Sequence, residues 1–215
     1  MYAVAKLTRA EYADYLQHLL DLDKEARYRR FATFVRDEVI AEHVRQLTND
    51  DAVFGCYAPG PRLVGAAVVK TFERQDGTRE GEIGISVHQD ARGKGIGRKL
   101  IHRALLWCRT HDVKALHTAC ITSNQEMANL AKSVGAKLHY SEGFLEGAIT
   151  LDPCDLSDHM LEVVADNHGM AEHNMLQAQA ALSKMLEMAF APTRFMMMSL
   201  PVAETDAEDT PAFRR

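Results

Sequence analysis

The spacing of hydrophobic residues predicts a mixed α/β domain over residues 1–152. Apolar runs that alternate with polar positions indicate strands, and apolar residues three or four positions apart indicate helices. Strands are expected at residues 3–7, 51–58, 63–72, 80–88, 115–121, 136–140 and 145–151. Helices are expected at residues 8–23, 37–47 and 124–133, and a further helix follows the glycines at 93–97 and carries apolar residues up to 108.

The order of these elements predicts a twisted, mostly antiparallel sheet that is flanked by helices. Turn-forming residues at 59–61, 75–78 and 142–143 join neighbouring strands into hairpins. By contrast, the strand at 80–88, the helix after it and the strand at 115–121 predict a parallel crossover. Along the first of these two strands the side chains alternate between the faces of the sheet, so Glu82 shares a face with Gly84 and Ser86.

Beyond Pro153 the composition shifts to Ala, Leu, Met, Glu and Gln. This predicts a mainly helical extension over residues 153–200, with a helix from 155 to 191 that is interrupted or kinked near residues 167–169. An apolar stripe in its second half comprises Met175, Ala178, Leu182, Met185 and Ala189. Either the chain's own domain or a second copy of it can cover this stripe. Residues 201–215 are expected to form a flexible, solvated tail.

Composition and charge exclude several classes of protein. A net charge of −5 and a pI near 6.1 argue against nucleic-acid binding by the molecule as a whole. No apolar run, Arg194–Leu200 included, reaches the length of a membrane span, and no signal peptide is apparent, so a cytoplasmic location is expected. The four cysteines show no paired spacing, and His159, His168 and His173 do not share a helical face. Neither disulfides nor a metal site is therefore expected.

A short stretch of basic and aromatic residues, Arg27–Phe34, lies between two predicted helices. Such interleaving can bind nucleic acid. Because the stretch is short and the chain is acidic, a solvated flank of a helix is the favoured interpretation. One lip of an acceptor-substrate cleft is the remaining alternative.

The strongest candidate for chemistry is a glycine-rich turn, Val87–Leu100, which follows a predicted strand and opens a helix. Gly93, Gly95 and Gly97 let the backbone approach a ligand and adopt dihedrals that side chains forbid, and unpaired N–H groups at the helix start favour an anion. The basic residues around the turn are Arg92, Lys94, Arg98, Lys99 and Arg103. The turn lacks the Ser or Thr of a mononucleotide P-loop, and its glycines have the wrong phase for a dinucleotide-binding fold. A phosphate-bearing cofactor of another class is therefore indicated.

The pattern Arg92-x-x-Gly95-x-Gly97 resembles the acyl-CoA pyrophosphate motif of the GCN5-related N-acetyltransferase (GNAT) superfamily. A second stretch, Asn124–Ala136, is similar to the family's later helix, which carries an Asn and ends in a Gly. The resemblance covers residues 3–151 and implies the GNAT fold, with acetyl-CoA or a related acyl-CoA as co-substrate and no metal. The cofactor-binding residues that it implies are Val87, Arg92, Gly93, Lys94, Gly95, Ile96, Gly97, Arg98 and Asn124. Among these, Asn124 would hydrogen-bond the pantetheine arm.

The resemblance also implies a reaction, the transfer of an acetyl or related acyl group to an amine by direct attack in a ternary complex. An amine acceptor is protonated at neutral pH, so a base is required. Glu82 is the candidate, because some members carry a glutamate base at this position. A strand carboxylate without a catalytic role is the alternative. Backbone N–H groups near Val87 are expected to bind the thioester carbonyl.

One departure from the family pattern concerns the acid that protonates the leaving thiolate. Many members carry a tyrosine seven residues after the Asn, and this chain has Ala131 there. That departure favours an alternative function, an acyl-CoA-binding sensor without catalysis, and a second alternative is a scaffold whose C-terminal helices recruit a partner. The helix at Asn124 and the residues Arg27–Phe31 are nearer to the subgroup that includes bacterial protein lysine acetyltransferases. The acceptor is thus either a small molecule or a protein lysine, and a homodimer through the C-terminal helices is one expectation.

Overall fold

The computed structural model describes residues 2–58 and 62–197. Its strands are β1 (Ala3–Lys6), β2 (Ala52–Tyr57), β3 (Leu63–Glu73), β4 (Arg79–Val87), β5 (Ala115–Ile121), β6 (Lys137–Ser141) and β7 (Phe144–Thr150). Its α-helices are α1 (Tyr12–Leu20), α2 (Lys24–Phe31), α3 (Asp37–Arg45), α4 (Ile96–Thr110), α5 (Gln125–Ser133) and α6 (Leu156–Met197). Two short 3-10 helices, η1 (Arg9–Glu11) and η2 (Gln89–Ala91), precede α1 and the glycine-rich turn.

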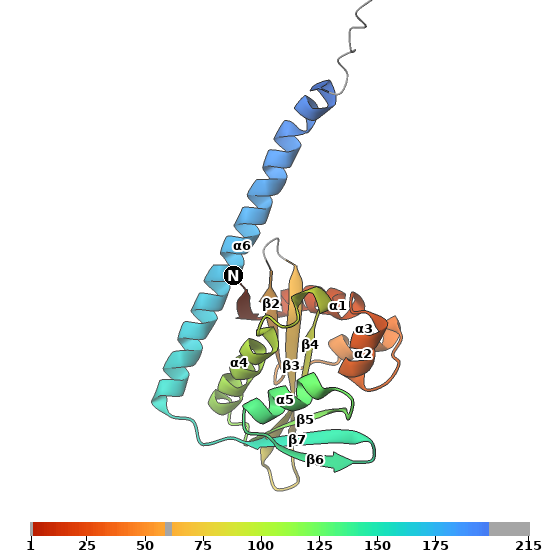
Figure 1. The fold of residues 1–215 in the computed structure, drawn as a ribbon. Helices are drawn as coiled ribbons and strands as arrows, with labels where there is room; N and C mark the ends of the chain where they lie inside the picture. The colour runs from red at the N-terminus through yellow and green to blue at the C-terminus, as the bar shows by residue number, and fades with distance from the viewer. Residues whose placement is uncertain (1, 59–61, 198–215) are drawn as a thin grey trace, which may run out of the picture.

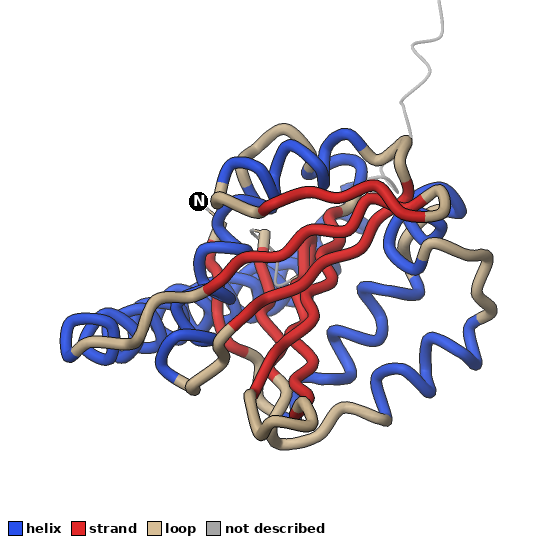
Figure 2. The backbone as a smooth tube through the Cα atoms, turned by 90° about the horizontal axis from the view of Figure 1, so that it is seen from below, coloured by secondary structure: helices blue, strands red, loops and turns tan. Residues whose placement is uncertain are grey.

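The strands form one sheet of seven in the order β1-β2-β3-β4-β5-β7-β6 (Figure 1). Within the described residues β4 and β5 pair in parallel, and every other neighbouring pair is antiparallel. Helices lie on both sides of the twisted sheet (Figure 2). The predicted fold class, with antiparallel hairpins and one parallel crossover through α4, is therefore confirmed.

The sheet opens between its two parallel strands. Pairing of β4 with β5 runs only from Glu80 to Glu82, although β4 continues to Val87 and β5 to Ile121. In contrast, β4 pairs with β3 along its whole length, as far as Val87 opposite Gly65. Backbone groups of β4 that point toward β5 beyond Glu82 therefore have no partner strand, and such groups need hydrogen bonds from elsewhere.

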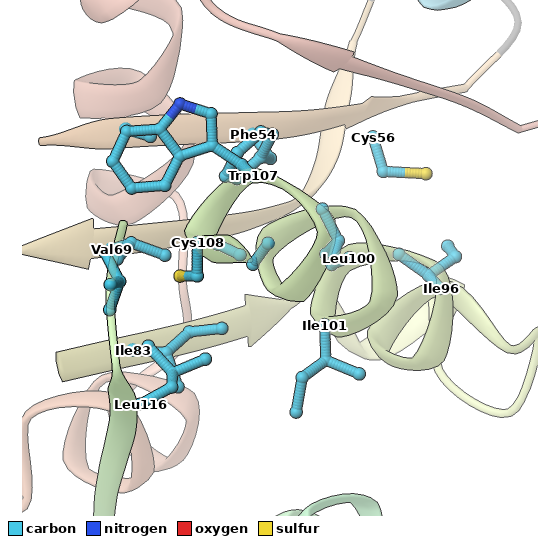
Figure 3. Packing of buried hydrophobic residues seen from close by; sticks show 14 of the residues in the cluster. Phe54, Cys56, Val69, Ile83, Ile96, Leu100, Ile101, Trp107, Cys108 and Leu116 are labelled. Carbon is cyan, nitrogen blue, oxygen red and sulfur yellow. The ribbon is translucent and has the colours of Figure 1, made fainter. Parts of the chain in front are cut away.

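Two apolar clusters hold the helices against the two faces of the sheet. On one face, Leu100 and Trp107 of α4 are fully buried against Phe54 and Ile83 (Figure 3). The rings of Phe54 and Trp107 meet edge to face, with centroids 6.4 Å apart. The opposite face packs against α1, α2 and α3 through residues that include Tyr15. The site described below lies where these two layers meet at the open part of the sheet.

The C-terminal helix α6 is a single uninterrupted helix of 42 residues, which extends well beyond the sheet (Figure 1). The predicted interruption near residues 167–169 is therefore wrong. A Cβ on Gly169 would lie 2.5 Å from the carbonyl oxygen of Val4 and 3.0 Å from the Cα of Ala5. The glycine thus permits close packing on β1 rather than a break, and the helix-forming residues around it keep the helix continuous.

Acidic residues of α6 pair with arginines of α4. Asp158 lies 2.6 Å from Arg109, and Arg103 pairs with Asp166 and, at 3.8 Å, with Glu162. Arg103 is buried beneath α6, so the prediction that it belongs to the basic patch at the glycine turn is wrong. Its charge is balanced by the two acids, which is what a buried guanidinium requires.

Most of the stretch Arg27–Phe34 is helical, because α2 runs from Lys24 to Phe31. The prediction that placed this stretch between helices is corrected accordingly. The turn at 59–61, residues 198–200 and the tail at 201–215 lie outside the described residues, as do the side chains of 189–197. The domain boundary after residue 152 stays a prediction.

The described residues hold four unpaired cysteine thiols. Among the described helices none combines the length and apolarity needed to cross a bilayer. The described residues also hold no group of three or more His, Cys, Asp and Glu side chains that could bind a metal ion.

Candidate functional site

The glycine-rich turn uses its glycines in two different ways. Gly93 and Gly95 both have φ of +74°, a region that side chains disfavour, and Gly95 is the N-cap of α4. Gly97 lies inside α4 without a positive φ, so the predicted reason for its being glycine is wrong. A Cβ there would meet the Leu130 side chain at 3.3 Å, so Gly97 allows α4 and α5 to approach closely.

The turn presents a row of unpaired N–H groups. Lys99 is the first residue whose N–H is bonded within α4, to the Gly95 carbonyl at 3.1 Å. In the described part of the chain, the N–H groups of residues 93–98 donate to no carbonyl oxygen. The start of α4 also carries the positive end of the helix dipole. Together these features form an anion-binding site.

A second set of unpaired N–H groups lies on β4. The His88 N–H donates to the Val64 carbonyl of β3 at 2.9 Å. Because successive residues of a strand direct their N–H groups to opposite sides, Ile85 and Val87 direct theirs toward β5, where the sheet has opened. The Arg92 Nε donates to the Val87 carbonyl at 3.4 Å on this same side. The edge of β4 can therefore bind the carbonyl oxygen of a ligand.

These two sets of donors border a cleft of about 450 Å³. Eight of the nine predicted cofactor-binding residues line it, and these are Val87, Arg92, Gly93, Gly95, Ile96, Gly97, Arg98 and Asn124. Lys94 does not line it, because its Nζ donates to the Asp90 carbonyl at 2.8 Å and lies 5.6 Å from the centre of the Tyr2 ring. Residues that were not predicted to bind the cofactor complete the walls, among them Ala26, Arg29, Arg30, Met127, Asn129, Leu130 and Ser133. We call this the first cleft.

Asn124 stands at the N-terminus of α5 and is buried. Its side-chain oxygen accepts a hydrogen bond from the Met127 N–H at 3.2 Å, which is an N-cap interaction. Because the oxygen is used in this way, the amide NH₂ group is the part of the side chain that remains for a ligand.

A second cleft of about 430 Å³ adjoins the first. The residues that line both are Arg29, Arg30, Ile85, Asn124 and Met127. Glu82 lines the second cleft, where its side chain is exposed, and Lys70 is its direct neighbour on β3. The C-terminal part of α2 and its C-cap, from Arg29 to Ala32, form another wall. The structure thus places the basic and aromatic stretch at a cleft, in line with the lip that was one of its three interpretations.

His43 lines the second cleft close to the positive charges of Arg30 and Lys70. The sequence did not indicate this histidine as a site residue. Burial lowers the pKa of His43 to about 4, and the charges of Arg30 and Lys70 contribute to that lowering. His43 is therefore neutral at neutral pH. The Arg30 guanidinium lies against β4 in the space that a Cβ of Gly84 would occupy, so a side chain at that position would displace the guanidinium. No periodicity in the sequence signals this contact between residues 54 positions apart.

A buried histidine anchors β4 to α1 beside the first cleft. The Nδ1 of His18 lies 3.1 Å from the Leu63 carbonyl, which can only accept, so this nitrogen carries the proton. The other ring nitrogen therefore accepts from the Ser86 hydroxyl at 2.8 Å. Burial, followed by the neighbouring His88, lowers the pKa of His18 to about 3. Ser86 lines the first cleft, so its place there is fixed by a neutral imidazole.

Residues 11–136 match the Acetyltransferase (GNAT) family. The chain belongs to this family. Its members catalyse acyl transfer from acetyl-CoA in general, and this general activity is supported for the present GNAT protein. The residue seven positions after Asn124 is Ala131, which is buried in α5, so the structure offers no hydroxyl acid at that position.

Solved structures of acetyltransferases share the fold. The GNAT domain of S. lividans PAT is 15% identical and has a TM-score of 0.58, with 69% of this chain and 89% of that chain covered. A phosphinothricin acetyltransferase from Sinorhizobium meliloti, solved in complex with acetyl-CoA, is 16% identical, with a TM-score of 0.58 and coverage of 72% and 94%. The ribosomal-protein-alanine N-acetyltransferase from Brucella melitensis is 20% identical, with a TM-score of 0.54 and coverage of 69% and 99%. At these identities the likeness concerns the fold alone.

Proposed function

We propose that this protein transfers an acetyl group from acetyl-CoA to an amine by direct attack in a ternary complex. One observation carries the proposal: a single cleft is lined by residues of the turn at 93–98 that have unpaired N–H groups and also by Ile85 and Val87, whose N–H groups face the opening of the sheet. The first set suits a diphosphate, and the second suits a thioester carbonyl. One extended ligand can satisfy both.

The residues of the first cleft fit acetyl-CoA, which would supply the acyl group as a thioester. The backbone of residues 93–98 would hold the diphosphate, with Arg92 and Arg98 adding charge. The amide NH₂ of Asn124 would donate to a carbonyl of the pantetheine arm. Lys94 stays a prediction as a ligand, because its amine now bonds the Asp90 carbonyl and would have to turn away from it.

For the acceptor side we propose Glu82 as the base. An alkyl ammonium has a pKa of about 10.4, so at neutral pH a proton must leave before the nitrogen attacks. Among the described residues Glu82 is the acidic residue of the second cleft, and no ion pair occupies its carboxylate. The amide C–N bond would form as the C–S bond breaks, while the N–H groups at Val87 stabilise the negative charge on the carbonyl oxygen.

The leaving thiolate does not need a tyrosine acid. A thiol has a pKa of about 8.5, so a thiolate leaves without full protonation in the transition state. Water can then supply the proton. The buried Ala131 is therefore compatible with turnover, and it also favours the second candidate function, a sensor that binds acyl-CoA without turnover.

Two measurements test the proposal. Calorimetric titration with coenzyme A should show one site per chain, and a thiol assay with acetyl-CoA and a panel of amines should show thiol release that depends on the amine. Binding without amine-dependent release would support the sensor. Absence of binding would overturn both functions.

The role of Glu82 is tested by Glu82→Gln. We expect turnover to fall at least tenfold near pH 7 and to recover partly at high pH, where more of the amine is already unprotonated. Lys132→Met, an exposed change on α5 outside both clefts, is the control for altered surface charge. A pH–rate profile that is the same for Glu82→Gln and the parent protein would remove Glu82 as the base.

We also propose a second copy of the chain as the partner of α6. The helix contacts its own domain through one face, which includes Asp158, Gly169, His173 and Leu176. A different face repeats apolar residues at alternating spacings of three and four, namely Leu161, Val164, Ala171, Met175, Ala178, Leu182 and Met185, with His168 as the one polar member. The large side chains among them are each more than half exposed. Such a seam is self-complementary in a two-stranded coiled coil.

A further inference from the structure

We infer that the acceptor is an amine that also carries an anionic group, such as an amino acid, and that Arg30 and Lys70 bind this group in the second cleft. The inference rests on the proposed function and names its acceptor class. It follows from the distribution of charge in the second cleft.

The second cleft contains more positive charge than its own residues neutralise. Its cationic side chains are Arg29, Arg30 and Lys70, and among the described residues Glu82 is its acid. Arg29 is already paired with Glu25 at 2.6 Å and with Glu126 at 3.4 Å. Within the described part of the chain, neither Arg30 nor Lys70 lies within 4.0 Å of a carboxylate oxygen. Two half-buried cations thus face the cleft without an ion pair, and the single carboxylate of Glu82 can balance only one of them.

The fold places both cations at the second cleft. The Arg30 guanidinium lies over Gly84 and within 4.9 Å of the centre of the Phe31 ring. Lys70 projects from the sheet directly opposite Glu82 in the register of β3 and β4. Half-buried charges that lack a partner are unfavourable, and a ligand anion would provide the missing interaction. The neutral His43 adds a polar contact without adding charge.

The position of Glu82 gives the acceptor its orientation. The Glu82 carboxylate attracts the ammonium group of the acceptor. Lys70, at the paired position of the neighbouring strand β3, attracts the anionic group. The amine and the anionic group would therefore be a short distance apart, as they are in an α-amino acid. Apolar side chains of Phe31, Val68 and Phe144 line the rest of the cleft and suit an apolar substituent. A polyamine, which has positive charge throughout, is disfavoured by Arg30 and Lys70.

The experiment compares matched acceptors. Thiol release is measured with phenylalanine, phenylalaninamide and phenethylamine, and with leucine, leucinamide and isopentylamine. The α-amine of an amino acid amide is less basic than that of the acid, and the decarboxylated amine is more basic. A preference for the acid over both analogues therefore cannot come from amine basicity. We expect kcat/KM for the acid to exceed both by about tenfold or more, the size of effect expected for one charged contact.

Variants connect this preference to the cations. Lys70→Met should reduce the preference for the acid about tenfold while leaving KM for acetyl-CoA unchanged, because Lys70 does not line the first cleft. Arg30→Met should do the same for the preference and also affect acetyl-CoA, because Arg30 lines both clefts. Lys132→Met, which removes a lysine from outside both clefts, should change neither value.

The outcomes separate this inference from the proposed function. Suppose that coenzyme A binds but that amines without an anionic group, polyamines or lysine peptides are acylated in preference to the amino acids. The inference is then overturned and the proposed function stands. The same holds if Lys70→Met and Arg30→Met leave the preference for the acid unchanged. If coenzyme A does not bind, the proposed function falls and this inference falls with it.

Discussion

At the scale of single residues, the site depends on positions where a side chain would strain the backbone or meet a neighbouring side chain. Gly95 adopts a left-handed backbone conformation, Gly97 makes room for Leu130, and Gly84 makes room for the Arg30 guanidinium. Glycine is therefore favoured at these three positions for three different physical reasons. The sequence motif contains Gly95 and Gly97, but it records neither the contact of Gly97 with Leu130 nor that of Gly84 with Arg30.

The role of Gly95 in ligand binding can be separated from its role in folding. Gly95 and Gly77 have φ of +74° and +80°, and a Cβ on either would meet no atom within 4 Å. Gly95→Ala and Gly77→Ala should therefore destabilise the fold alike, by about 1 kcal/mol. Since only Gly95 lines the first cleft, its variant alone should weaken coenzyme A binding, about tenfold or more, in calorimetric titration. Equal affinity in the two variants would mean that the turn is purely structural.

His18 makes stability dependent on pH. Its pKa is lowered from 6.5 to about 3 by burial, so between these values the unfolded chain holds a proton that the folded chain does not. The contribution to stability is thus complete above about pH 6.5 and is lost as the pH falls toward 3, by at most about 1.4 kcal/mol per pH unit. His18→Gln should lower stability at pH 8 but flatten this slope.

Urea unfolding at pH 8, 6, 5 and 4 measures the slope for both proteins. His43, whose pKa burial lowers to about 4, should leave a residual slope in the variant. A slope that is unchanged by His18→Gln would contradict the assignment of this proton to His18.

At the scale of helices and strands, three structural features create the site. β5 separates from β4 after Glu82, α4 begins after its N-cap Gly95 with unpaired N–H groups, and α2 places Arg30 against Gly84 of β4. The sequence predicted β4, α4, β5 and the crossover between them, because each has its own periodicity and turn residues. It did not predict α2 as a helix, since Lys24–Phe31 is strongly polar and lacks a long apolar stripe.

Because α6 packs closely on β1, we expect a glycine-to-alanine change in this helix to lower the free energy of unfolding, whereas such a change in a helix usually raises it. Inside a helix, replacing Gly by Ala normally stabilises by about 1 kcal/mol. Gly169→Ala should instead destabilise by about 1–3 kcal/mol, because its Cβ would lie 2.5 Å from the Val4 carbonyl oxygen. The free energy of unfolding is measured with urea, and Ala181→Gly, at an exposed position of the same helix outside the seam, measures helix propensity. A stabilised Gly169→Ala would show that α6 does not pack closely on β1.

At the scale of the whole molecule, α6 has two faces with different partners. One pairs with Arg103 and Arg109 of α4, and the exposed apolar seam faces away from the domain. We expect a dimer whose contact runs along this seam. Leu182→Lys together with Met185→Lys should convert it to a monomer, because each lysine would bring an unpaired charge into the apolar contact.

Light scattering after size-exclusion chromatography measures the mass. Ser183→Lys, an exposed change between the two seam positions on another side of the helix, should leave the dimer intact. A parent protein that is monomeric at all accessible concentrations, or a double variant that remains dimeric, would contradict the proposed contact.

The features that could be predicted from the sequence depend on local geometry: the strands and helices with clear periodicity, the parallel crossover and the glycine turn. Each of these is specified by residues a few positions apart, so a short window contains the whole cause. The burial of Arg103 beneath α6, the unbroken helix at Gly169 and the contact of Arg30 with Gly84 became known only from the folded molecule. These depend on contacts between residues more than 50 positions apart, which folding brings together and which no local pattern records.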